Sequence, residues 1–179
     1  FEYYSEDPLL AGKLAAGFIR GAEGEGVGTS LKHFAVNNQE TLRMSVSAEV
    51  DERALHELYL RPFEIAVKEG APSTVMCSYN RINGVYASEN RMLLTRILRE
   101  QWGFDGLVMS DWGAVYRRPA GVAAGLDLEM PSSGGVTDRE IVRAVRAGRL
   151  DEAALDALCA RVLRLALAHA PQRKKAYPA

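Results

Sequence analysis

The stretch Gly106-Leu107-Val108-Met109-Ser110-Asp111-Trp112-Gly113 decides the fold of this 179-residue chain. It predicts a short strand over residues 106–110, followed by a polar turn that begins at Asp111. The strand is apolar at successive positions rather than at alternate ones. Strands with this pattern are buried on both faces, as in parallel sheets that helices cover. Asp111 is therefore expected at the carboxyl end of a buried strand.

Three further segments predict strands of the same sheet, namely residues 27–36, 74–78 and 126–130. Helices are expected between and after them, starting at or after Asp7, Asp51, Asn90, Thr137 and Asp151. Pro62 is expected to kink the second of these helices. Strands that alternate with helices predict an α/β fold, either a (β/α) barrel or an open doubly wound sheet. Since no GxGxxG turn follows a strand, a dinucleotide site is disfavoured.

Composition excludes several classes of function. Hydrophobic residues make up 47% of the chain, enough for a core, and 22 Lys and Arg against 23 Asp and Glu give a net charge of -1. This balance disfavours nucleic acid and anionic membranes as partners. The two cysteines, Cys77 and Cys159, suggest neither a disulfide framework nor a CxxC site, and both are expected in the core. His56 and His169 have no further ligands at metal-binding spacing, so no metal and no cofactor are expected.

The compartment stays open between cytoplasmic and secreted. No signal peptide begins the chain, and no apolar run is long enough to span a bilayer. The chain starts at Phe1 without a methionine, so the native start is expected to be missing.

Polar residues follow the predicted strands, where the catalytic loops of a barrel lie. Asp111 is the strongest candidate for a catalytic residue, although an aspartate after a strand also commonly caps a turn. Trp112 fits either a core position or an apolar face for a sugar ring. Lys32 and His33 can donate to hydroxyl groups, but adjacent residues at a strand end point apart, so one of them is as well explained by a structural role. Arg43 fits a surface ion pair with Glu40.

Residues 97–114, ILREQWGFDGLVMSDWGA, resemble the nucleophile signature of glycoside hydrolase family 3. Four other segments resemble the same family, in the family's order: FEYYSEDP at 1–8, LKHF with NNQE at 31–40, MCSYN with NG at 76–84, and GLDLEMP at 125–131. The resemblance covers nearly the whole chain. It implies that Asp111 is the nucleophile and that the following residues bind the terminal sugar or border the reaction centre: Lys32, His33, Arg43, Met76, Tyr79 and Trp112.

The chemistry of a retaining glycosidase agrees with these implied roles. One carboxylate attacks the anomeric carbon while a second carboxyl group, about 5–5.5 Å away, protonates the departing oxygen. A cation such as Arg43 would favour the ionised form of Asp111, which attack requires. Lys32, His33 and Arg43 would donate hydrogen bonds to sugar hydroxyls.

Departures from the family pattern define what the chain is expected to lack. The family's sugar-binding arginine and a further aspartate would fall before Phe1, and the glutamate acid/base of the glucosidases belongs to a second domain. We therefore expect a partial (β/α)8 TIM-barrel-like domain of about four βα units. Residues 1–170 would form the C-terminal half of the barrel, and residues 171–179 would start an interdomain linker or tail. The isolated chain is expected to be inactive, and its partners would be the missing barrel half and the C-terminal domain of the same protein.

Two details favour one branch of the family. Residues 32–39 read KHFAVNNQ instead of the KHFPGHGD loop from which the N-acetylglucosaminidases take their acid, and Trp112 replaces the cysteine more usual in β-xylosidases. The expected activity is retaining hydrolysis of terminal non-reducing β-D-glucosyl residues from β-glucosides or oligosaccharides. The alternatives are a β-xylosidase or α-L-arabinofuranosidase of the same family, or a non-catalytic carbohydrate-binding remnant.

Overall fold

A computed structural model of the chain describes residues 3–169. The helices are α1 (Pro8–Gly24), α2 (Glu52–Ala54), α3 (Arg61–Ile65), α4 (Arg118–Ala124), α5 (Val136–Arg146) and α6 (Glu152–Ala168). Wider, π-helical turns form η1 (Leu55–Tyr59), η2 (Ala66–Gly70) and η4 (Met92–Gln101), and η3 (Ala87–Glu89) is a short 3-10 helix. The strands are β1 (Ser30–Phe34), β2 (Ser47–Ala48), β3 (Thr74–Cys77), β4 (Arg81–Ile82), β5 (Val85–Tyr86) and β6 (Leu107–Ser110).

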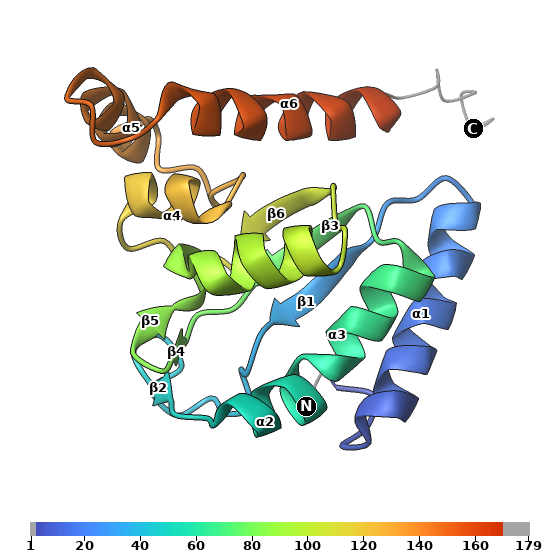
Figure 1. Cartoon of the computed structure of the whole chain (residues 1–179). Helices are drawn as coiled ribbons and strands as arrows, with labels where there is room; N and C mark the ends of the chain where they lie inside the picture. Colours follow the sequence, from blue (N-terminus) through green and yellow to red (C-terminus); the bar gives the residue numbers. More distant parts are fainter. Residues whose placement is uncertain (1–2, 170–179) are drawn as a thin grey trace, which may run out of the picture.

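The main sheet is parallel, with the strand order β1-β3-β6 (Figure 1). Val75 in β3 pairs with Leu31 on one side and with Val108 on the other, and both Val75 and Val108 are fully buried. Burial on both faces is what their continuous apolar sequence predicts. The expected α/β fold with a partial barrel is thereby confirmed.

The predicted strand over residues 126–130 is wrong in its extent. This segment lies along β6, but a single parallel bridge, Met109 to Leu128, is its only ladder pairing within the described residues. Two of its carbonyl groups are taken by a side chain instead, because the Arg118 guanidinium donates to the carbonyl oxygens of Leu126 and Asp127 at 3.0 and 2.8 Å. The segment ends at Pro131, which has no N–H to extend a ladder.

A second small sheet, β2-β4-β5, stands near the carboxyl ends of the main strands (Figure 1). Sequence alone indicated a loop here. The β4–β5 hairpin turns at Asn83 and Gly84, which both have positive φ, as the tight two-residue hairpin turn requires. The Asn83 side chain also donates to the carbonyl oxygen of Val50 and accepts from its N–H, at 2.9 and 2.8 Å.

The helices cover the sheet, and a core forms between them. α1 and α3 pack together beside β1 (Figure 1). Phe34 of β1 meets Phe63 of α3 edge-on, with the ring centroids 5.2 Å apart. Pro62 lies in the first turn of α3, directly after the break at Leu60, which agrees with the expected kink. The peptide bonds Lys32–His33, Phe34–Ala35 and Met130–Pro131 are cis.

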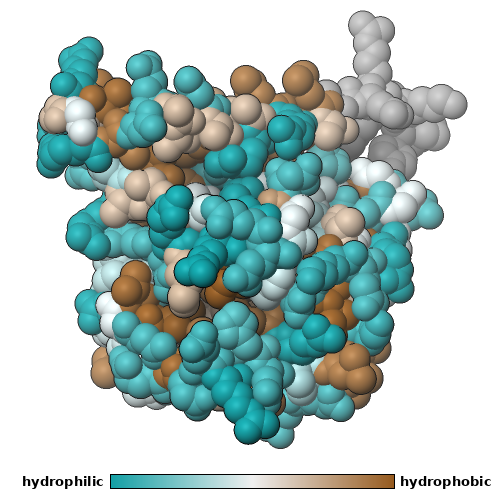
Figure 2. Space-filling view, viewed as in Figure 1, coloured by the Kyte–Doolittle hydropathy of each residue, from teal (hydrophilic) through white to brown (hydrophobic). Residues whose placement is uncertain are grey.

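α6 runs across the top of the molecule in Figure 1, and Leu155, Leu158 and Val162 pack in a small hydrophobic cluster with residues of α4 and α5. Leu158 is its one buried residue, while Leu163 and Leu167 are 61% and 75% exposed. Figure 2 shows hydrophobic side chains along this helix on an otherwise mostly hydrophilic face. Cys159 is exposed, so its expected place in the core is wrong. Cys77 is buried as expected, and burial raises the pKa of its thiol to about 12.

None of the helices in the described part of the chain is both long and apolar enough to cross a membrane.

Candidate active site

Asp111 lies directly after β6 and is held by the backbone around it. Its N–H donates to the carbonyl oxygen of Cys77 at 3.1 Å, which extends the pairing of β3 with β6. Its Oδ1 accepts the N–H of Trp112 at 2.7 Å. The residue is only 8% exposed. A carboxylate fixed in this way at a strand end has a defined position for reaction.

Two further donors meet the Asp111 carboxylate from the neighbouring strands. His33 of β1 places Nε2 3.3 Å from Oδ2 of Asp111, and both side chains are largely buried. Tyr79, two residues after the end of β3, is buried, and hydrogen bonding to Asp111 contributes to the pKa of its hydroxyl. Burial first, and then that hydrogen bond and the negative charge of Asp111, raise the pKa of Tyr79. The ends of β1, β3 and β6 thus converge on one carboxylate.

Arg43 forms the next layer. Its Cζ lies 4.8 Å from the centroid of the Tyr79 ring, so the cation faces the tyrosine that bonds Asp111. Arg43 also makes an ion pair with Glu40 at 2.8 Å, and both side chains are partly exposed. The ion pair predicted from sequence is therefore present, and it lies beside the candidate site rather than apart from it.

The three remaining candidates, Trp112, Met76 and Lys32, differ in exposure and in surroundings. Trp112 is 61% exposed, so its alternative interpretation as a core residue is wrong. Met76 is half-buried in β3, paired with Met109 of β6. Lys32 is exposed and lines a small cavity beside β1 together with Tyr3 and other residues.

The larger cavities lie to one side of the nucleophile candidate. One of about 520 Å³ is lined by the start of α1 and by Leu58, Tyr59 and Phe63. Another of about 320 Å³ is lined by the loop after β1 and by Asn80. Asp111 and Trp112 line neither of these two cavities.

Sequence reasoning missed an aromatic stack beside the site. Tyr86 of β5 and Tyr116 of the loop after Asp111 stack with ring centroids 3.6 Å apart, and the Cζ of Arg81 lies 4.3 Å from the Tyr86 ring. The Tyr116 hydroxyl donates to the carbonyl oxygen of Met44. The stack joins three loops at the carboxyl ends of the strands, and only the small hairpin, which the sequence pattern did not reveal, brings these rings together.

Among residues 3–169, no three or more His, Cys, Asp or Glu side chains gather in a way that could hold a metal ion. The chemistry available at the site is that of one buried carboxylate surrounded by hydrogen-bond donors. Parallel strands, covering helices and a carboxylate at the carboxyl edge define the class of protein as a (β/α)-barrel enzyme domain.

Comparison with known proteins gives the family. The profile described as "Glycosyl hydrolase family 3 N terminal domain" matches residues 1–165. The chain is 55% identical over 165 residues to thermostable β-glucosidase B of Acetivibrio thermocellus, and 58% identical over 156 residues to the exo-α-(1->6)-L-arabinopyranosidase of Bifidobacterium longum. The chain belongs to glycoside hydrolase family 3.

Solved structures agree with this assignment. The family 3 β-glucosidase of Bifidobacterium adolescentis superposes on 94% of the chain with a TM-score of 0.91 and 54% identity. β-Glucosidase 3B of Thermotoga neapolitana, in complex with glucose, superposes on 93% with a TM-score of 0.89 and 47% identity. The chain covers 25% and 24% of those two chains. The alignment with the Acetivibrio relative covers 92% of this chain but only 22% of that protein. The alignment with the Bifidobacterium longum relative covers 87% of this chain and 20% of that protein.

Proposed function

We propose that this chain carries the nucleophile of a retaining β-glucosidase and that Asp111 is that nucleophile. The observation that supports it most is the convergence of His33 and Tyr79 on the buried Asp111 carboxylate. Donors at a carboxylate hold it in one orientation, which attack by a nucleophile requires. The relatives named β-glucosidases support the choice of sugar.

The reaction would proceed in two balanced steps. An oxygen of Asp111 attacks the anomeric carbon, the bond from that carbon to the glycosidic oxygen breaks, and the departing oxygen takes a proton from a general acid outside residues 3–169. Water then attacks the same carbon, gives up a proton to that group, and releases the sugar and the Asp111 carboxylate. Two inversions give net retention of the anomeric configuration.

The other candidate residues would bind the terminal sugar in this proposal. Lys32, His33 and Arg43 carry the donors for its hydroxyl groups. The exposed indole of Trp112 offers an apolar face for the sugar ring, and Met76 and Tyr79 border the reaction centre. No cofactor enters the proposed reaction.

The domain division remains part of the same proposal. Residues 1–170 would form the C-terminal half of the barrel, completed by other parts of the same protein. Residues 171–179, proposed as the start of a linker or tail, lie outside the described residues.

A second activity deserves a parallel test because of one relative. The Bifidobacterium longum protein named as an exo-α-(1->6)-L-arabinopyranosidase is 58% identical over its aligned residues, as similar as the glucosidases are. A pocket for an arabinopyranosyl group is therefore the second candidate. β-Xylosidase, α-L-arabinofuranosidase and a non-catalytic binding remnant are the further alternatives.

The test uses the full-length gene product and four nitrophenyl glycosides: β-glucoside, α-L-arabinopyranoside, β-xyloside and α-L-arabinofuranoside. The proposal expects the highest kcat/KM on the glucoside, with β-glucose as the first product seen by NMR. A higher kcat/KM on another glycoside would assign that sugar instead. Release of α-glucose first would contradict the retaining mechanism, and glucose binding without turnover of any glycoside would support the binding remnant.

A further inference from the structure

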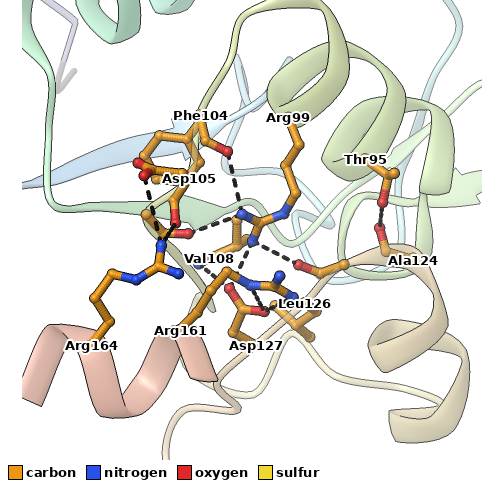
Figure 3. A network of polar contacts seen from close by, with 12 residues as sticks. Thr95, Arg99, Phe104, Asp105, Val108, Ala124, Leu126, Asp127, Arg161 and Arg164 are labelled. Carbon is orange, nitrogen blue, oxygen red and sulfur yellow. Dashed lines mark hydrogen bonds and ion pairs between the residues drawn. The ribbon is translucent and has the colours of Figure 1, made fainter. Parts of the chain in front are cut away.

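A buried carboxylate other than Asp111 lies beside the nucleophile strand. Asp127 is 1% exposed, and its Oδ2 accepts the N–H of Val108 in β6 at 2.8 Å and Nη2 of Arg99 at 2.7 Å. Its Oδ1 accepts Nε of Arg161 at 2.8 Å (Figure 3). Arg99 belongs to η4 and Arg161 to α6, so one side chain joins two helices to the strand that ends at Asp111.

The contacts of this network leave it little freedom to rearrange. The Arg99 guanidinium also donates to the carbonyl oxygens of Gly106 and Gly125, at 3.0 and 3.3 Å. Burial lowers the pKa of Arg99, whereas the charge of Asp127 opposes that shift. Charges removed from water are tolerated where they are paired and hydrogen-bonded, and loss of one partner leaves the others uncompensated. The network therefore favours a single geometry.

That geometry reaches Asp111 through the backbone. Residues 127–130 flank β6 on the side opposite to β3, with the N–H of Ser110 donating to the carbonyl oxygen of Leu128 and the N–H of Gly113 to that of Met130, both at 2.9 Å. The N–H groups of Asp127 and Leu128 also donate to the carbonyl oxygen of Val108, at 2.9 and 3.1 Å, although the segment forms no extended strand. The bond from Val108 to Asp127 supplies an additional fixed point, three residues before Asp111.

We propose that Asp127 is a positioning residue for Asp111, acting through β6 and held in place by Arg99 and Arg161. This inference rests on the proposed function. A reacting group displaced by about 1 Å loses roughly 100-fold in rate, even when the change lies away from the chemistry. Relaxation of the network would thus slow attack by Asp111 while the sugar-binding groups on β1 and on the loops after β1 and β3 stay in place.

A purely structural role makes a different prediction. It would lower the fraction of folded molecules, but each folded molecule would react at the normal rate. The distinction requires the rate of the chemical step per intact active site, together with a probe of β6 that does not depend on activity.

The test compares three variants of the full-length protein: Asp127→Asn, Arg161→Met and Arg164→Met. Arg164→Met is the matched control, because Arg164 lies on the same helix but pairs at 3.6 Å with Asp105, both side chains being well exposed. Arg161→Met keeps the test decisive if Asp127→Asn does not fold, because the carboxylate and Arg99 remain. A 2-deoxy-2-fluoroglucosyl fluoride gives the inactivation rate constant and the inhibitor Ki, and the mass of the adduct counts the intact sites. Hydrogen exchange of residues 107–111 reports on β6.

Asp127→Asn and Arg161→Met are expected to lower the inactivation rate constant per intact site by about 10–100-fold, with an unchanged Ki and faster exchange in β6. Arg164→Met should behave as the wild type. Wild-type inactivation rates per intact site in the first two variants would overturn the proposal, whatever their stability. If the wild type takes up no label, the proposed function fails. Hydrogen exchange of residues 107–111 in the variants then decides whether Asp127 positions β6. Unchanged exchange would then overturn the positioning role, and selectively faster exchange would support it.

Discussion

Gly106→Ala is expected to destabilise the barrel domain by crowding the start of the nucleophile strand. An ideal Cβ at Gly106 would lie 2.5 Å from the carbonyl oxygen of Ser73 and 2.6 Å from Cζ of Phe104. The Ser73 oxygen already accepts the N–H of Leu107 at 3.3 Å, at the beginning of the β3–β6 pairing. The neighbour that has to give way is therefore backbone, not only the tip of a side chain.

The size of the effect follows from these distances. Side-chain carbons essentially never approach closer than 3.0 Å, so the contact must open from 2.5 Å by 0.5 Å or more. Overpacking of this kind costs about 1–3 kcal/mol, and the backbone neighbour places this change near the upper end. Because β6 must move away from β3, activity is expected to fall along with stability.

The assay is thermal inactivation of the full-length enzyme, since multidomain proteins often unfold irreversibly and are compared by half-life. Gly17→Ala is the matched control. Gly17 lies within α1, nothing within 4 Å would meet its Cβ, and alanine should stabilise this helix by about 0.5–1 kcal/mol. The two substitutions should thus act in opposite directions. A Gly106→Ala enzyme as long-lived as Gly17→Ala would refute the close approach of β6 to β3.

Three further outcomes are expected. Asp111→Asn should abolish turnover and leave the circular dichroism spectrum unchanged, because a neutral amide fills the same volume but does not attack; substantial residual activity would argue against the nucleophile. Steady-state kinetics on the glucoside should show a lower kcat/KM for each of Lys32→Ala, His33→Ala and Arg43→Ala, equivalent to a loss of about 1–3 kcal/mol of transition-state stabilisation. Arg43→Ala should have the largest effect. If all three variants kept wild-type kinetics, their binding role would lose its support. Residues 1–179 expressed alone should not hydrolyse even dinitrophenyl glucoside and should associate in light scattering, because β1 pairs on one side only within the described sheet; an active monomer would contradict this.

Local patterns predicted the main strands and most helix starts, although α5 begins at Val136, before the start expected at or after Thr137. β1, β3 and β6 lie inside the predicted ranges, and β3 and β6 are largely buried. The caps at Asp7 and Asp151 are confirmed, since their side chains accept backbone N–H groups of the first turns of α1 and α6. The Asn90 side chain accepts the N–H of Leu93 and caps the helical turns that continue into η4. These features depend on neighbours in sequence, which is why the sequence displays them.

Features that depend on distant partners were missed. α4 is seven residues long and no side chain caps its start, and its local signals, Pro119 in the first turn and Gly125 at its end, were not recognised. The segment 126–130 has the apolar pattern of a strand, but Arg118 takes two of its carbonyl groups. Cys159 lies beside the apolar stripe of Leu155, Leu158 and Val162 that packs against the protein, and its own side chain is exposed.

The candidate site also combines features that the local sequence predicted with features that it did not. Parallel strands predicted that the loops around Asp111 and Tyr79 would meet, because their strand ends lie at one edge of the sheet. The approach of His33 to Asp111 was not predicted as a pair, since His33 was expected to bond sugar hydroxyls. The ring of contacts around Asp127 joins residues from 99 to 161, and such long-range pairing of charges has no local signature.

The most direct test of the central claim is the site of covalent labelling. The full-length protein is inactivated with a 2-deoxy-2-fluoroglucosyl fluoride and digested, and the peptide that carries the added mass is sequenced by mass spectrometry. The account predicts one fluoroglucosyl group on Asp111, in the peptide containing Gly106-Leu107-Val108-Met109-Ser110-Asp111-Trp112. A label on any other carboxylate would contradict the assignment of the nucleophile.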